Sequence, residues 1–264
     1  MHRPLTERDL LPSGPLRRIG RSVHLFDGVD STNTFLLSRC DPPVDGAVAC
    51  AEYQSAGRGR LNRPWLAPRG SSILLSVLLL EPPDSILLAH ATMLGCLAAC
   101  DAVAASTPCE PDVRWPNDLS VEGRKLGGVL AESRMLGERR AVVIGVGINV
   151  LQQRAHFPPE LRDTATSLEI ECEKSIERGP VAARLVAMLD QRLLSARKSP
   201  GYWKELRAEW IERCGDVGQR VRLHHDTREY KGTIVDIADG GDLLVKLDGG
   251  GQRRFEAAKT TRLW

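Results

Sequence analysis

Apolar residues in the first half of the chain are grouped in runs that short polar segments separate. The longest run, 71–80 (SSILLSVLLL), is nearly continuous, which is typical of a strand buried on both faces of a sheet. A second strong strand is predicted over 139–150 (RRAVVIGVGINV), and shorter runs at 23–29 and 46–53 predict two more. In 112–118 (DVRWPND), a strand is expected to run into a turn.

Helices are predicted between and after these strands. The segment 84–105 is apolar almost all round, so we expect it to pack inside the domain. Asp30 or Ser31 is placed to cap a helix that continues with three apolar residues. Apolar periodicity predicts two more helices, at 180–197 and 202–213.

Glycine and proline mark the predicted turns. Gly123 is expected at the turn of a hairpin over 119–132, and 158–169 (PPELRDTATSLE) is expected to be a loop. The resulting order of strands with interleaved helices predicts an α+β fold.

The pattern changes after Cys214, where apolar and polar residues alternate between glycine-rich turns. Strands are predicted around 221–223, 234–237 and 243–247, with hairpin turns at ADGGD and LDGGG. This is typical of a small β-barrel. The predicted organisation is an extension over 1–20, a main domain over 21–214 and a small domain over 215–264.

Composition narrows the class of protein. The chain has 264 residues, 42% of them hydrophobic and 27% charged, as in ordinary soluble globular proteins. The formal net charge of +2 argues against a dedicated DNA-binding protein. The sequence has no apolar core of a signal peptide, and its 7 cysteines lack paired spacing, so we expect a cytoplasmic protein without a membrane partner. Cys96 and Cys100 are expected in the core rather than in a zinc site.

One loop, 51–65 (AEYQSAGRGRLNRPW), combines glycine, arginine and tryptophan. Glycines expose backbone N–H groups that bind anions, and guanidinium groups match phosphate and carboxylate. A tryptophan provides a flat face for a purine. The loop matches neither the Walker A pattern nor GxGxxG, and by composition a solvated basic loop is an equal alternative.

Five motifs occur in series: DSTN at 30–33, YQSAGRGRLNRPW at 53–65, RWPND at 114–118, GRKLGGVLAE at 123–132 and GVGIN at 145–149. Together they closely resemble the catalytic domain of biotin protein ligases. A further segment, ATSL at 165–168, is similar to that family, and the C-terminal region resembles the SH3-like domain of its bacterial members. The resemblance covers about residues 21–264.

The resemblance implies a fold and a reaction. The implied fold is a catalytic domain like that of class II aminoacyl-tRNA synthetases, with a mixed sheet flanked by helices. Biotin would attack the α-phosphate of ATP, with Mg²⁺ present, to give biotinyl-5′-AMP and pyrophosphate. A lysine of a carboxylase's biotin carrier protein would then take the biotin, and AMP would leave. Fixed cations and N–H donors suit this chemistry, because two anions must be brought together.

The resemblance also implies the site residues. For biotin these are Ser31, Thr32, Gln54, Gly57, Arg58, Arg60, Lys125, Gly128, Gly145 and Gly147. For ATP and the adenylate they are Arg58, Arg60, Arg63, Trp65, Asn117, Asp118 and Asn149. The implied catalytic residues are Lys125 and Arg60. Asp118 would either hold Mg²⁺ or orient Lys125, and the sequence does not separate these two roles.

Plainer structural roles compete with these assignments. Ser31 suits a helix N-cap, and Asp118 suits a turn. Trp65 would serve as a core residue, Lys125 as a surface residue of a hairpin and Asn149 as a capping residue.

Three further expectations qualify the resemblance. Asn62 stands where family members often have glycine, and asparagine tolerates a left-handed backbone better than most residues. The segment 1–20 is too short for the helix-turn-helix domain of some bacterial members, so we expect a monofunctional ligase that does not bind DNA. His224 and His225 are expected at a turn or on the surface.

Two other functions compete with that of a biotin ligase. A lipoate–protein ligase shares the implied fold and acyl-adenylate chemistry, whereas the glycine–arginine loop with Trp65 and the C-terminal barrel favour biotin. A non-catalytic nucleic-acid-binding module is disfavoured by the low net charge and the 5% aromatic content. The sequence leaves open whether the protein is a monomer or a homodimer.

Overall fold

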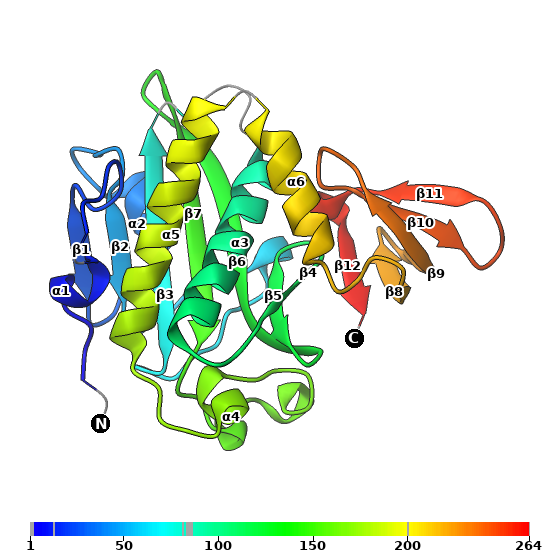
Figure 1. Ribbon diagram of the computed structural model, residues 1–264, viewed down its shortest axis with the longest axis horizontal. Coiled ribbons are helices and arrows are strands. Elements are labelled where there is room, and N and C mark those ends of the chain that lie inside the picture. Colours follow the sequence, from blue (N-terminus) through cyan, green and yellow to red (C-terminus); the bar gives the residue numbers. More distant parts are fainter. Residues whose placement is uncertain (1–2, 13, 81, 83–86, 200, 264) are drawn as a thin grey trace.

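The computed structural model describes residues 3–12, 14–80, 82, 87–199 and 201–263. At its centre is a seven-stranded mixed sheet in the order β1-β2-β3-β7-β6-β5-β4 (Figure 1). The β1–β2 pair is parallel and the other pairs are antiparallel. The strands are Val23–Phe26 (β1), Val48–Ala51 (β2), Ser72–Leu80 (β3), Asp112–Arg114 (β4), Asp118–Val121 (β5), Arg124–Leu136 (β6) and Arg139–Asn149 (β7).

Helices cover both faces of this sheet. Helices α3 (Leu88–Ser106), α5 (Arg178–Lys198) and α6 (Tyr202–Glu212) lie over one face, and α2 (Thr32–Ser38) lies on the other (Figure 1). Every residue of β3 is buried, and its side chains alternate between the two layers. The predicted α+β fold, with a strand buried on both faces, is confirmed.

Helix α3 is the one described helix that is long and apolar enough to cross a membrane by length and composition. In the fold it packs against β6, β7 and helix α5. The predicted position of this helix inside the domain is confirmed for most of its residues between His90 and Val103, whereas Leu88 at its start is exposed. Residues 84–86 lie outside the described part of the chain.

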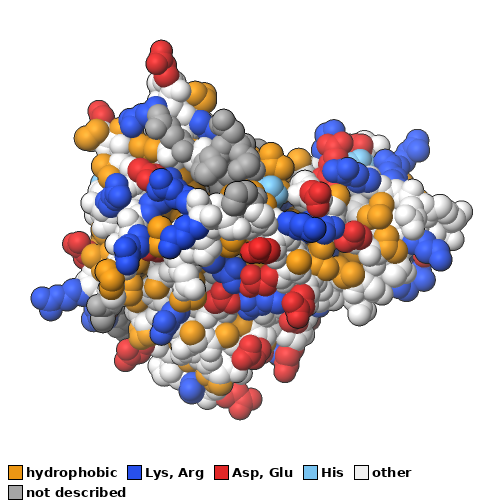
Figure 2. All heavy atoms as spheres, turned by 45° about the horizontal axis from the view of Figure 1, so that its top comes forward, with side chains coloured by type: hydrophobic (Ala, Val, Ile, Leu, Met, Phe, Trp, Pro, Cys, Tyr) orange, Lys and Arg blue, Asp and Glu red, His pale blue; other side chains and the backbone are white. Residues whose placement is uncertain are grey.

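A second sheet forms a separate lobe (Figures 1 and 2). It has five antiparallel strands in the order β11-β10-β9-β8-β12 around a core that includes Val221, Ile234 and Phe255. On the face shown in Figure 2, both lobes carry basic and acidic side chains. The strands are Arg220–His225 (β8), Arg228–Ile237 (β9), Leu243–Leu247 (β10), Gln252–Phe255 (β11) and Thr260–Leu263 (β12).

The prediction for the two adjacent histidines was wrong for His225. Both histidines lie within β8, where successive side chains point to opposite faces. His224 is therefore exposed, whereas His225 is 7% exposed, and its Nδ1 lies 2.8 Å from Thr260 Oγ1.

Two segments contain structure that the sequence did not indicate. The predicted loop at 158–169 includes a 3₁₀ turn at Pro159–Leu161 and the start of α4 (Leu168–Cys172). The Ser167 hydroxyl caps α4 by accepting from the Ile170 backbone N–H. Near the N-terminus, α1 (Glu7–Leu10) packs against α5, and Leu10 is fully buried in the main core.

Candidate active site

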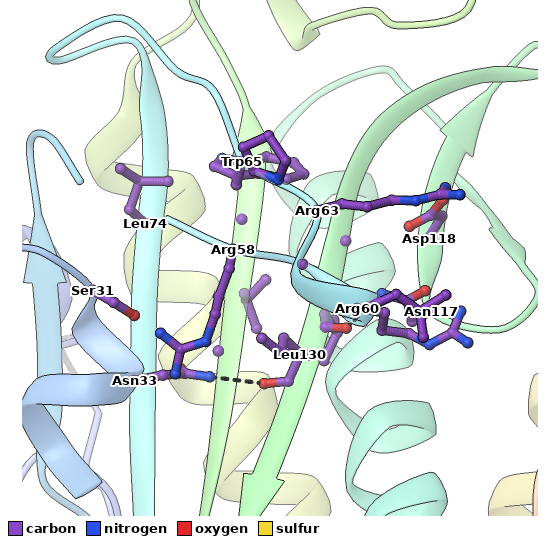
Figure 3. Close-up of a pocket in the computed structure, with 18 of the residues that line it drawn as sticks. Ser31, Asn33, Arg58, Arg60, Arg63, Trp65, Leu74, Asn117, Asp118 and Leu130 are labelled. Carbon is purple, nitrogen blue, oxygen red and sulfur yellow. Dashed lines mark hydrogen bonds between the residues drawn. The ribbon is translucent and has the colours of Figure 1, made fainter. Parts of the chain in front are cut away.

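One cavity brings together segments that lie far apart in the sequence. It is bounded by the start of α2, the loop 53–65, the strands β3, β7 and β6, and the turn before β5 (Figure 3). Strand β12 of the small sheet completes the boundary. Each of the five quoted motifs contributes to its lining. The lining includes Ser31, Thr32, Asn33, Gln54, Arg58, Arg60, Arg63, Trp65, Asn117, Asp118, Lys125, Gly128, Gly145, Gly147, Thr261 and Arg262.

One end of the cavity is polar and uncharged. Gln54 Oε1 accepts from both the backbone N–H and the hydroxyl of Thr32, at 2.8 and 3.0 Å. Ser76 Oγ lies 2.7 Å from Thr32 Oγ1. Ser31 is the N-cap of α2, as one reading predicted, and it also lines the cavity. Hydroxyl and amide groups of this kind can both donate to and accept from a ureido group.

The glycines of GVGIN leave room for side chains that pack flat on β7. A Cβ at Gly145 would lie 2.2 Å from Asn33 Oδ1. A Cβ at Gly147 would lie 2.9 Å from the indole ring of Trp65. The spacing of these glycines therefore matches the places where Asn33 and Trp65 meet the strand.

The glycine–arginine loop folds back on itself. The Trp65 backbone N–H donates to Gly57 O at 2.9 Å, and the Gly59 N–H donates to Arg63 O at 2.8 Å. Asn62 adopts the left-handed conformation with φ 56°, and Leu61 does so as well with φ 54°. The expected tolerance of asparagine for a left-handed backbone at this position is confirmed. Leu61 and Asn62 thus form this turn without a glycine.

The three arginines of the loop bind different parts of the protein. Arg58 donates to Glu132 and Thr34 within the main domain. Arg60 donates to the carbonyl oxygens of Ala257 and Thr260, and Arg63 donates to Thr261 Oγ1 at 3.1 Å. Burial lowers the pKa of Arg60 to about 10.

Lys125 and Asp118 form an ion pair inside the cavity. Their Nζ and Oδ1 atoms are 2.7 Å apart, and the ammonium lies 5.8 Å from the centre of the Trp65 ring. Asn117, the residue before Asp118, is buried and donates from its side-chain amide to Val129 O at 2.8 Å, which fixes the turn before β5. Of the two roles considered for Asp118, the structure shows contact with Lys125.

Two residues assigned by the resemblance are not among those lining the cavity. Asn149 is buried, with its amide bonded to Thr166 O at 3.0 Å and to Gln152 at 2.9 Å. Gly57 is a buried residue of the loop itself, where a Cβ would lie 3.0 Å from Trp65 O. Their assigned contacts with ligands stay predictions.

Sequence reasoning missed several residues that line the cavity. Asn33 and Trp115 stand inside quoted motifs, so their motif position was a usable signal. Thr261 and Arg262 carried no such signal, because they belong to the small sheet and reach the cavity only through the packing of the two lobes. Asp216 fixes that packing: it is fully buried, accepts from the Trp115 N–H at 2.9 Å and pairs with Arg262.

The described residues contain no group of three or more His, Cys, Asp or Glu side chains arranged to hold a metal ion. Asp118 is the one carboxylate among the described residues that line the cavity. A single carboxylate fits a Mg²⁺ ion that is carried mainly by phosphate oxygens, and it does not fit an ion held by the protein alone.

Comparison with known families matches both lobes. The model of the Biotin/lipoate A/B protein ligase family matches residues 25–149, and that of the Biotin protein ligase C terminal domain matches residues 217–258.

Individual relatives agree with these matches. The biotin–[acetyl-CoA-carboxylase] ligase of Mycobacterium tuberculosis is 36% identical over 237 residues, which cover 87% of this chain and 85% of the relative. The bifunctional ligase/repressor BirA of Bacillus spizizenii is 30% identical over 214 residues, and the match spans 65% of its length. The biotin protein ligase of Aquifex aeolicus in complex with biotin and ATP superimposes with a TM-score of 0.78 at 25% identity, over 92% of this chain and 99% of that one. The chain therefore belongs to the biotin/lipoate A/B protein ligase family.

Proposed function

We propose that the protein is a biotin protein ligase that uses ATP. In the first step a carboxylate oxygen of biotin attacks the α-phosphorus of ATP, which forms biotinyl-5′-AMP and releases pyrophosphate. In the second step the ε-amine of a lysine on a biotin carrier protein attacks the acyl carbon, and AMP leaves. The proposed acceptor is the biotin carrier domain of a carboxylase.

The charge of the cavity is the observation that carries this proposal. Among the described residues that line it, five are cationic and one is anionic: Arg58, Arg60, Arg63, Lys125, Arg262 and Asp118. Such a cavity offsets the repulsion between a carboxylate and a triphosphate and stabilises charge that develops at the α-phosphate. The neutral polar end at Thr32 and Gln54 is suited to the ureido ring of biotin.

Lys125 would bridge the two reacting groups. Its ammonium is held between the Asp118 carboxylate and the face of Trp65, so its position is set before ligands bind. A compact ammonium can contact the biotin carboxylate and the α-phosphate at once. Trp65 would stack on the adenine, since its partly buried ring lines the cavity.

Mg²⁺ would enter this site with ATP. The phosphate oxygens would supply most of its ligands, and Asp118 is the carboxylate of the cavity that could join them. The ion would neutralise charge on the phosphates, while the protein's own cations orient them.

The test is ATP–pyrophosphate exchange with biotin, with lipoate or with neither. We expect exchange with biotin alone, because the C-terminal lobe matches the biotin ligase C-terminal domain. Exchange with lipoate alone would assign the lipoate-ligase activity of the same family instead. No exchange with either acid would contradict the ligase proposal.

A further inference from the structure

A buried asparagine connects the uncharged end of the cavity to a carboxylate outside it. Asn33 is 5% exposed; its Oδ1 accepts from the Ser76 hydroxyl at 2.6 Å. Its Nδ2 donates to Leu130 O at 3.2 Å and to Glu132 Oε2 at 2.7 Å. The carboxylate of Glu132 is thus held in one orientation by a side chain that is itself locked against β3 and β6.

Glu132 uses that orientation to bind Arg58. Arg58 Nη2 lies 3.1 Å from Glu132 Oε1 and 3.4 Å from Oε2, and Nη1 donates to Thr34 Oγ1 at 2.9 Å. In Figure 3 the Arg58 side chain extends from the loop across the cavity toward Asn33. Glu132 itself is absent from the cavity lining, whereas Arg58 belongs to it. The ion pair with Glu132 therefore ties the glycine–arginine loop to β6. The hydrogen bond to Thr34 ties the same loop to α2.

We propose that Glu132 is a positioning residue of the ligase reaction, which acts by fixing the guanidinium of Arg58 against the bound acyl phosphate. This inference rests on the proposed function. A guanidinium carries five N–H donors, and the contacts with Glu132 and Thr34 leave some of them for a ligand. A donor held in place before the reaction stabilises developing charge without reorganisation.

Glu132 also explains how the cations can share one cavity. Arg58 is drawn to its own counter-charge on β6, whereas Lys125 is paired with Asp118 and Arg60 is bound by carbonyl oxygens of the small sheet. Each cation therefore has a separate partner that determines its place. Without Glu132, Arg58 would keep only the neutral Thr34 hydroxyl and could turn toward solvent, since it is about a third exposed.

The experiment measures biotin-dependent ATP–pyrophosphate exchange and the thermal unfolding midpoint for a set of variants. Glu132→Gln removes the charge at nearly constant shape, and Glu132→Asp keeps the charge on a shorter side chain. Arg58→Gln and the double variant Glu132→Gln/Arg58→Gln complete a cycle that isolates the coupling between the two residues. The matched control is Glu229→Gln, which breaks the exposed Arg222–Glu229 pair of the small sheet.

If Glu132 acts through Arg58, Glu132→Gln lowers kcat/KM of exchange roughly tenfold, and Glu132→Asp restores part of it. In the Arg58→Gln background the same change has no further effect, and the unfolding midpoints of Glu132→Gln and Glu229→Gln stay close to wild type. The positioning role would be overturned if the losses of exchange in the two single variants add up in the double variant. It would also be overturned if exchange falls only in variants whose unfolding midpoint falls with it. Wild-type protein without biotin-dependent exchange would overturn the proposed function itself, and this inference with it.

Discussion

At the scale of single residues, Gly145 illustrates how the absence of a side chain shapes the site. Asn33 lies where a Cβ on Gly145 would be, only 2.2 Å from its Oδ1. Asn33 cannot easily move away, because its amide is bonded to Ser76, Leu130 and Glu132. The glycine is therefore a requirement of the hydrogen-bond network as well as part of the cavity wall.

Gly145→Ala tests this requirement. We expect the free energy of unfolding to fall by about 1–3 kcal/mol, because a methyl group is forced into a filled space. Chemical denaturation measures the change. The matched control is Gly249→Ala, since a Cβ at Gly249 meets nothing within 4 Å. Equal losses in both variants would show that Asn33 moves aside without cost.

Lys125→Ala tests the central residue of the proposed reaction. Exchange of pyrophosphate should fall by a factor on the order of 10²–10³, because a fixed cation at the reacting oxygens is lost. Biotin binding, measured by calorimetry, should persist, since the contacts around Gln54 and Thr32 are untouched. Lys246→Ala, at an exposed position of β10, is the control. Exchange at the wild-type rate in Lys125→Ala would contradict the assignment.

At the scale of elements, helix α5 secures the segment that precedes β1. Asp190 on α5 is 4% exposed, and its carboxylate accepts from the backbone N–H groups of Arg17, Arg18 and Ile19 at 2.8–2.9 Å. Glu52 makes a similar contact with the Leu5 N–H at 2.7 Å. A carboxylate that accepts several N–H groups in a buried position makes strong, charge-assisted hydrogen bonds. These contacts order the segment before β1 without adding a strand to the sheet.

Asp190→Ala should lower the free energy of unfolding by about 2–3 kcal/mol, because buried backbone donors lose their acceptor. Hydrogen exchange at residues 17–19 should accelerate at the same time. The neighbouring variant Gln191→Ala, at an exposed position of the same helix, should change neither quantity. Unchanged exchange at 17–19 in Asp190→Ala would show that the segment is held by other contacts.

At the scale of the whole molecule, the two lobes meet around a buried carboxylate. Asp216 is fully buried, lies 3.4 Å from Arg114 of β4, and is paired with Arg262 of β12. The Trp115 Nε1–H also donates to Gly241 O of the small lobe at 2.8 Å. The hydrophobic core runs without interruption from the large sheet to residues of the small one. The lobes are therefore expected to unfold together.

Asp216→Ala should reduce the free energy of unfolding by about 3–5 kcal/mol, because it leaves two arginines near each other without their carboxylate. Asp248→Ala is the control, since it breaks the exposed pair with Arg220 and should cost under about 1 kcal/mol. Denaturation followed by tryptophan fluorescence measures both. A loss in Asp216→Ala no larger than that of Asp248→Ala would contradict a structural role at the junction.

The sequence predicted those features that depend on local pattern. The apolar run at 71–80 identified β3, and Gly123 identified the β5–β6 hairpin. The start of α2 was placed at Asp30 or Ser31, and Ser31 is its N-cap. It failed where distant segments meet: nothing local indicates that Glu132 pairs with Arg58, or that Asp216 lies against Trp115. His225 is a different case, because the strand was expected only around 221–223, whereas β8 runs to His225 and its alternation buries that side chain.

The contacts of Arg60 and Arg63 with β12 have a consequence for biosynthesis. During synthesis the loop 53–65 and strand β7 emerge from the ribosome long before residues 260–262. The lining of the cavity nevertheless includes Thr261 and Arg262. During translation these two arginines therefore lack the carbonyl and hydroxyl groups that later bind them. A nascent chain that stops short of β12 would carry all five motifs and still present an incomplete cavity.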